Sequence, residues 1–131
     1  MPFAVLTHSD RCPCLSGETY GQCCAPFHRG QANAPTAERL MRSRYSAFVV
    51  GDERYLLSSW HPRTRPASLD LDPELRWYRL DILSTRNGGL LDDEGLVEFR
   101  AFYRSADARG DQHEVSRFAR DGRAWKYLDA T

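Results

Sequence analysis

Four cysteines lie within thirteen consecutive positions of this 131-residue chain, and the remaining sequence contains none. They form two close pairs separated by eight residues, Cys12 with Cys14 and Cys23 with Cys24. Four thiolates on one short loop can fold into a tetrahedron around Zn²⁺, with Zn–S distances of about 2.3 Å. Disulfides explain the spacing less well. A disulfide within either close pair would form a small, strained ring, and disulfides between the pairs would stabilise only a terminal loop. The spacing predicts a closed, structural zinc site, with redox-active or simply reduced thiols as the alternatives.

The residues around the cysteines favour a compact turn. Pro13 stiffens the first arm, and Gly17 accepts the positive φ that a chain reversal needs. Tyr20 and Phe27 are expected to cover the sulfur atoms and shield the site. His28 is a reserve nitrogen ligand, but four thiolates already complete the coordination shell, which favours a surface histidine.

Residues 12–24 read Cys-Pro-Cys-Leu-Ser-Gly-Glu-Thr-Tyr-Gly-Gln-Cys-Cys, which resembles the SEC-C zinc motif first known from the tail of the SecA translocation motor. That motif runs Cys-x-Cys, eight residues, then Cys followed by Cys or His. The resemblance implies the zinc ligands, carried over position by position: Cys12, Cys14, Cys23 and Cys24. The motif usually has glycine where this chain has Leu15, a departure that affects the geometry of the loop and leaves every ligand in place.

Arg44 is the charged residue that stands out on the expected helix. It lies four positions from Leu40 and four from Phe48, so its guanidinium starts on the face that should pack on a sheet. One hypothesis is that Arg44 binds a small anionic ligand in a cavity. The favoured alternative is a structural ion pair with Glu114 or Asp129, or a side chain that extends outward to solvent.

His61 follows Trp60 and precedes Pro62. A neutral imidazole there could act as a general acid or base near pH 7. The favoured alternative is structural, because packing of Trp60 and helix termination by Pro62 explain the tripeptide, and spacing identifies no residue that would orient the histidine.

Two further pairs come from an expected strand, where side chains alternate between faces. Either His113 with Arg117 or Glu114 with Ser116 could enter a cavity, and the alternative is an exposed strand face. Arg42, on the helix, is expected to face solvent.

The elements that must position these residues begin after a linker at residues 29–35. Helical apolar spacing predicts a helix over 37–50, with Thr36 as its N-cap and Gly51 as its end. Asp52 can cap a second helix from Glu53 to about Trp60, followed by a polar connector over 63–73.

The second half of the chain changes to a strand-like alternation of polar and apolar residues. Turn formers such as Asn87-Gly-Gly, Ala108-Arg-Gly and Asp121-Gly separate the alternating segments. Strands are therefore predicted at 75–85, 96–105, 112–120 and 124–129. Two helices followed by an antiparallel meander predict an α+β fold with helices covering one sheet face.

A second resemblance covers nearly the whole chain. It is carried by the run Leu40-Met-Arg-Ser-Arg-Tyr-Ser-Ala-Phe48, by Tyr55, by Trp60-His-Pro62 and by Trp125-Lys-Tyr-Leu-Asp129, which is similar to the YchJ family of bacterial proteins. The resemblance implies a SEC-C-like zinc knuckle over residues 1–30 and a nuclear transport factor 2-like (NTF2-like) domain over 31–131. Such a domain is a cone of helices packed on a curved antiparallel sheet, with a cavity at its open end. Family members commonly carry a second SEC-C motif at the C-terminus, whereas this sequence stops at Thr131, so no role resting on that motif is expected.

Composition narrows the function classes. Lys+Arg and Asp+Glu are both 18, so the formal net charge is zero and nucleic acid is not the expected partner. The first residues lack the cationic lead of an export signal, and no stretch is apolar enough to span a bilayer. Together with reduced cysteines, these features predict a cytoplasmic protein.

Two functions follow as hypotheses. The leading one is a noncatalytic adaptor whose structural zinc knuckle presents a surface to another protein, because zinc with four cysteine ligands leaves no open position for substrate. The alternative is a small-molecule binding protein or an enzyme that uses the cavity of the curved sheet, with Arg44 as an anion clamp and His61 as general acid or base. The cavity candidates are Arg44, Trp60, His61, Glu114 and Arg117.

Overall fold

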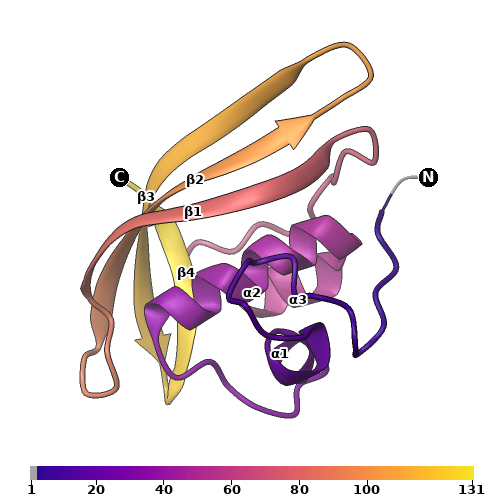
Figure 1. The fold of residues 1–131 in the computed structure, drawn as a ribbon. Coiled ribbons are helices and arrows are strands. Elements are labelled where there is room, and N and C mark those ends of the chain that lie inside the picture. The colour runs from indigo at the N-terminus through magenta and orange to yellow at the C-terminus, as the bar shows by residue number, and fades with distance from the viewer. Residues whose placement is uncertain (1–2) are drawn as a thin grey trace.

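The computed structural model describes residues 3–131 and arranges them in three layers (Figure 1). Helix α2 occupies the middle layer, between a curved sheet on one side and the N-terminal knuckle on the other. The elements in chain order are η1 (Tyr20–Gln22), α1 (Ala25–His28), α2 (Ala37–Val50), α3 (Glu53–Ser58), β1 (Arg76–Asn87), β2 (Glu94–Arg104), β3 (Arg109–Asp121) and β4 (Ala124–Ala130). Within residues 3–131, no helix combines the length and the apolar character needed to cross a membrane.

The caps predicted for α2 are present. The Thr36 side chain accepts a hydrogen bond from the backbone N–H of Arg39, and Gly51 ends the helix in the left-handed region at φ 73°. The next helix, α3, is capped by Asp52, which accepts from the N–H of Tyr55.

Helix α3 ends at Ser58, two residues earlier than predicted. The chain leaves the helix there to pair with β4: the N–H of Tyr127 donates to the carbonyl of Ser59, and the N–H of His61 donates to the carbonyl of Tyr127. These hydrogen bonds to a distant strand replace further helical ones, which local spacing does not reveal.

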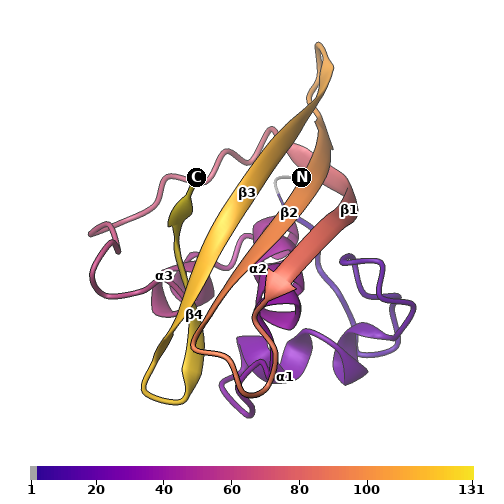
Figure 2. The same ribbon diagram turned by 90° about the vertical axis from the view of Figure 1, so that its left-hand side faces the viewer.

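All four predicted strands are present, and they pair antiparallel in the order β1-β2-β3-β4. Register shifts interrupt β1 between Trp77 and Arg79 and between Ile82 and Ser84, and a third lies between Arg117 and Phe118 of β3. Shifts of this kind bend a strand and increase its twist. The sheet therefore curves around α2, as the two orthogonal views show (Figures 1 and 2).

The hydrophobic core lies between the concave sheet face and α2. Its buried side chains include Leu40, Met41, Tyr45, Leu80, Phe99, Phe118 and Trp125. The predicted α+β class, with helices on one face of a curved antiparallel sheet, is confirmed.

The knuckle contains two short helices that the sequence pattern does not reveal. The 3-10 helix η1 and the four-residue α1 lie on either side of Cys23 and Cys24, and Pro26 sits in the first turn of α1, where its missing N–H costs nothing. Both helices are too short to produce an apolar period.

Candidate metal centre, cleft and cavity

The four cysteine sulfur atoms form one buried cluster. All four Sγ atoms lie within 4.8 Å of one another, and each cysteine is at most 2 % exposed. The distance from Cys14 Sγ to Cys23 Sγ is 3.6 Å, and that from Cys23 Sγ to Cys24 Sγ is 3.8 Å. A tetrahedron with Zn–S bonds of about 2.3 Å has edges of about 3.8 Å. The cluster therefore has the donor type and number of a zinc site, and its spacing is compatible with one.

Hydrogen bonds within the cluster favour the thiolate form at Cys14 and Cys23. Bonds from the thiols of Cys12 and Cys24 and from the hydroxyl of Ser16 lower the pKa of the Cys14 thiol. The hydroxyl of Ser16 also lies 3.1 Å from Cys23 Sγ, where it can support that sulfur from outside the coordination shell. The same hydrogen bonds raise the pKa of the Cys12 and Cys24 thiols, so a metal ion must displace those protons to bind four thiolates.

The first cysteine pair lies on a tight loop. The N–H of Cys12 donates to the carbonyl of Glu18, and the N–H of Leu15 donates to the carbonyl of Cys12. Leu15 adopts φ 64°, the left-handed region, at the position where the SEC-C motif usually has glycine. A side chain in this region is strained by contact between its Cβ and the backbone.

Replacing Leu15 with glycine should raise the free energy of unfolding by up to about 1 kcal/mol, because relief of the strain outweighs the stability lost through the greater freedom of the unfolded chain. Denaturant unfolding of the Leu15→Gly protein would measure this gain. Leu83→Gly is the matched control, since both leucines are 48 % exposed and Leu83 lies in a strand, where glycine destabilises. Equal losses in the two variants would contradict the assignment of strain to Leu15.

The knuckle is fastened to the outer face of α2. Arg42 Nη1 donates to the carbonyl of Cys14 at 2.6 Å, and Arg42 Nε pairs with Glu38 at 3.0 Å. Cys12 Sγ lies 3.7 Å from the hydroxyl of Ser46, which is fully buried. The expectation that Arg42 faces solvent is therefore wrong: its solvent-side position on α2 is covered by the knuckle.

His28 joins the two layers as well. Its Nε2 lies 2.8 Å from the carbonyl of Ser43 and so carries the proton, and its Nδ1 accepts from the hydroxyl of Tyr20 at 2.6 Å. Burial lowers the pKa of the His28 imidazole, which favours this neutral form. The prediction of a surface histidine is wrong, and both ring nitrogens have partners other than metal.

A cavity of about 210 Å³ lies between α2 and the concave sheet face. Arg44 lines it and is 4 % exposed. Its Nη1 donates to the carbonyl of Leu56 at 2.8 Å and to the hydroxyl of Ser59 at 2.7 Å. The guanidinium carbon lies 5.2 Å from the Trp60 ring centroid and 4.6 Å from that of Tyr127.

Arg44 has no carboxylate within ion-pair distance among residues 3–131. The favoured prediction of an ion pair with Glu114 or Asp129 is therefore wrong. Asp129 instead holds Arg117 on the opposite sheet face, with N–O distances of 2.6 and 2.7 Å. Burial lowers the pKa of the Arg44 guanidinium to about 10, which still leaves it charged at neutral pH.

Three cavity candidates meet in this cavity and two do not. Arg44, Trp60 and Glu114 line it, together with Ser116, so this strand pair faces inward. Arg117 lies on the outer face, as does His113, which contacts Glu98 at 2.6 Å.

His61 is not among the residues that line the cavity. Its Nδ1 accepts from the backbone N–H of Arg63 at 3.1 Å, so the ring closes a local turn. The structure thus does not place the candidate acid or base beside Arg44.

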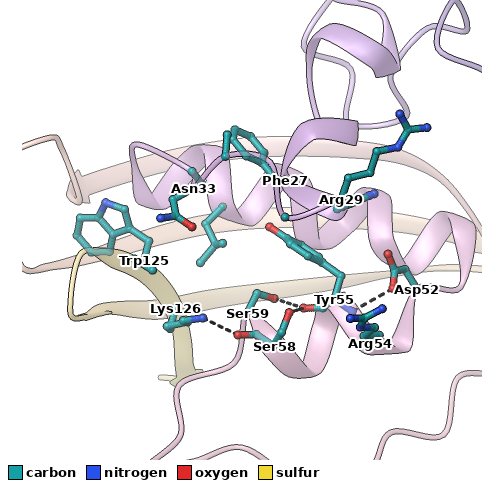
Figure 3. A pocket seen from close by; sticks show the side chains of 16 residues that line it. Phe27, Arg29, Asn33, Asp52, Arg54, Tyr55, Ser58, Ser59, Trp125 and Lys126 are labelled. Atoms are coloured by element: carbon teal, nitrogen blue, oxygen red, sulfur yellow. Dashed lines mark hydrogen bonds between the residues drawn. The ribbon is translucent and has the colours of Figure 1, made fainter.

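A second hollow, of about 420 Å³, lies where the knuckle meets the domain. We call it the junction cleft. Phe27 and Arg29 from the knuckle, Arg54 and Tyr55 from α3, and Lys126 from β4 are among its lining residues. Figure 3 shows these side chains gathered around Tyr55, with Trp125 at the far end of the view.

The junction cleft carries more positive than negative charge. Arg29, Arg54 and Lys126 line it, against the single carboxylate of Asp52. Neither arginine forms an ion pair with any residue between 3 and 131, and Lys126 Nζ donates to the carbonyl of Ser58 at 2.6 Å. Sequence reasoning missed these cations because they come from three separate elements and share no spacing.

The fold and the cysteine cluster define a class: an NTF2-like domain that follows a SEC-C motif. Residues 36–130 match the family described as "YchJ, middle NTF2-like domain", and residues 9–26 match the SEC-C motif. The chain belongs to the YchJ family, whose curated members are named UPF0225 proteins.

Relatives and solved structures agree with this assignment. A UPF0225 protein from Streptomyces coelicolor is 58 % identical, with 90 % of this chain and 92 % of the relative covered. One from Deinococcus radiodurans is 46 % identical over 91 % of this chain and 87 % of the relative. The solution structure of a SEC-C motif containing protein from Rhodopseudomonas palustris superposes with a TM-score of 0.80 at 31 % identity, covering 92 % of this chain and 96 % of that one.

Proposed function

We propose that this protein is a noncatalytic adaptor in which a structural Zn²⁺, held by Cys12, Cys14, Cys23 and Cys24, fastens the knuckle to the domain. The support is the buried cluster of four sulfur atoms within 4.8 Å of one another. A zinc ion with four thiolates has no position left for water or substrate, so it would organise structure and not perform hydrolysis. Four reduced thiols also favour the cytoplasm as its location.

The main support for an adaptor function is the junction cleft, because the knuckle and the domain each contribute residues to its wall. Its aromatic side chains lie among three cations and one carboxylate. A partner that matches this surface is an acidic segment of another protein with an apolar side chain for the cleft. Such complementarity gives specificity and speeds association.

Affinity capture from a lysate of the protein's own bacterium tests this proposal, with quantitative comparison of four baits. Proteins bound by the wild type should be lost from Arg29→Glu/Arg54→Glu, which reverses the charge of the cleft. They should also be lost from Cys24→Ser, which removes a metal ligand and so the knuckle wall.

The matched control is Arg86→Glu/Arg109→Glu, which makes the same change of charge at exposed positions on β1 and β3. It should retain the wild-type partners. Equal retention by the cleft variant would refute binding in the cleft, and equal retention by Cys24→Ser would remove the knuckle from the binding function.

A second function is favoured by a different observation. Arg44 is buried and charged, it faces a cavity, and no carboxylate among the described residues lies within ion-pair distance of it. We propose that this cavity binds a small molecule. No reaction is assigned to it, because His61 lies outside the cavity and makes its own local contact.

A further inference from the structure

The cavity between α2 and the sheet holds two opposite charges that do not pair with each other. Arg44 comes from α2 and Glu114 from β3, and both line the cavity. No ion pair joins them, so each charge is left to be matched by something else in the cavity.

Arg44 has donors left over in a fixed orientation. A guanidinium carries five N–H donors, and the two on Nη1 go to Leu56 and Ser59. Nε and Nη2 make no hydrogen bond with residues 3–131, and they are the pair of groups that binds a carboxylate in a bidentate manner. The rings of Trp60 and Tyr127 restrain the guanidinium plane.

Glu114 has acceptor capacity left over. A carboxylate offers about four acceptor sites. Three are used by neutral donors: Ser116 Oγ and Tyr127 Oη on Oε2, and Gln112 Nε2 on Oε1 at 3.0 Å. The remaining site suits an ammonium group, since no cation among residues 3–131 lies within ion-pair distance of this carboxylate.

Tyr45 is a further polar residue among those that line the cavity. Its side chain is 2 % exposed and lines the same cavity. Its hydroxyl is the one fully buried side-chain polar atom in residues 3–131 that lacks a hydrogen-bond partner. Buried polar groups in folded proteins are nearly always paired, so a water molecule is expected beside this hydroxyl.

The rest of the wall is apolar, with Met41, Phe48, Trp77, Phe99 and Ala101 contributing to it. The volume of about 210 Å³ is below the roughly 300 Å³ at which pockets for drug-sized ligands begin. The ligand must therefore be small, with an apolar body and few polar groups.

We propose that the cavity binds a small zwitterion with an apolar side chain, such as a free hydrophobic α-amino acid. Its carboxylate lies on Nε and Nη2 of Arg44, its ammonium group on Glu114, and its side chain against the aromatic wall. A simple anion would satisfy Arg44 but would meet the negative charge of Glu114. This inference rests on the second proposed function and is independent of the junction cleft, which shares no lining residue with the cavity.

Calorimetry and the indole N–H signals of Trp60 and Trp77 would test the proposal on the intact protein. The probes are L-phenylalanine, L-leucine, 3-phenylpropanoate, which lacks the ammonium group, and 2-phenylethylamine, which lacks the carboxylate. L-phenylalanine or L-leucine should bind, and each truncated probe should bind at least tenfold more weakly than the tighter of these two or not at all.

Variants separate the two charges. Glu114→Gln should weaken amino-acid binding at least tenfold and leave 3-phenylpropanoate unaffected or better bound, whereas Arg44→Met should weaken both. Glu98→Gln, on the outer sheet face beside His113, is the matched control and should change neither. Circular dichroism would check that the Arg44→Met protein is folded. If that protein is unfolded, the Glu114→Gln protein still tests the proposal.

Each failure has its own meaning. Binding of 3-phenylpropanoate as tight as that of L-phenylalanine would overturn the zwitterion and leave a ligand cavity for anions. If none of the four probes binds at millimolar concentration, both the zwitterion proposal and the proposed ligand-binding function of the cavity are refuted.

Discussion

Removing the metal with a strong chelator should unfold residues 8–30 and leave the sheet folded. The helices of the knuckle are short, with three residues in η1 and four in α1, and we expect its hydrogen bonds to α2 through Arg42 and His28 to be too few to hold residues 8–30 without the metal. Binding of zinc by a small cysteine site contributes on the order of 10 kcal/mol to folding. Without the metal, four crowded thiols would remain where the ion should lie, and the loop would open.

Amide hydrogen exchange with and without chelator measures this effect. Protection should be lost over residues 8–30 and reduced in α2 near Ser46, whose hydroxyl lies 3.7 Å from Cys12 Sγ. Strands β2 and β3, which lie in the middle of the sheet, should keep their protection. The Cys24→Ser protein is the control, because its knuckle should be open before any chelator is added. Unchanged protection of residues 8–30 would refute the stabilising role.

The second large effect should come from Trp125→Ala, which should lower the free energy of unfolding by about 3–5 kcal/mol. Trp125 is 2 % exposed, its Nε1 donates to the carbonyl of Pro35 at 3.2 Å, and the guanidinium of Arg120 lies 4.4 Å from its ring centroid. It therefore joins the linker before α2 to the last strand. Its loss would leave a large cavity and an unpaired carbonyl.

Urea unfolding of the metal-loaded protein would measure the loss. Tyr78→Ala is the control, because Tyr78 is 43 % exposed on the outer sheet face and should cost less than about 1 kcal/mol. Similar losses for the two aromatic residues would contradict the view that the core runs between the sheet and α2.

Local signals in the sequence were sufficient for most of the fold. The range of α2 was predicted correctly because Thr36 and Gly51 mark its ends and its apolar residues recur at helical spacing. The strands were predicted because turn formers separate alternating segments. The end of α3 could not be predicted, since it depends on hydrogen bonds between Ser59, His61 and the distant Tyr127.

The candidate site divides in the same way. The cysteine cluster was predictable because all its members lie close in the sequence. The environments of Arg42, Arg44 and His28 were not, since each depends on a segment far along the chain. Helical spacing correctly placed Arg44 toward the sheet, but strand alternation left open whether Glu114 or Arg117 shares that side.

The central claim is that one ion coordinated by sulfur alone closes the knuckle. X-ray absorption at the zinc edge, with metal counting on the purified protein, tests it most directly. We expect one zinc per chain and four sulfur neighbours at about 2.3 Å. A protein without zinc, or a zinc with an oxygen or nitrogen neighbour in place of one sulfur, would contradict the account.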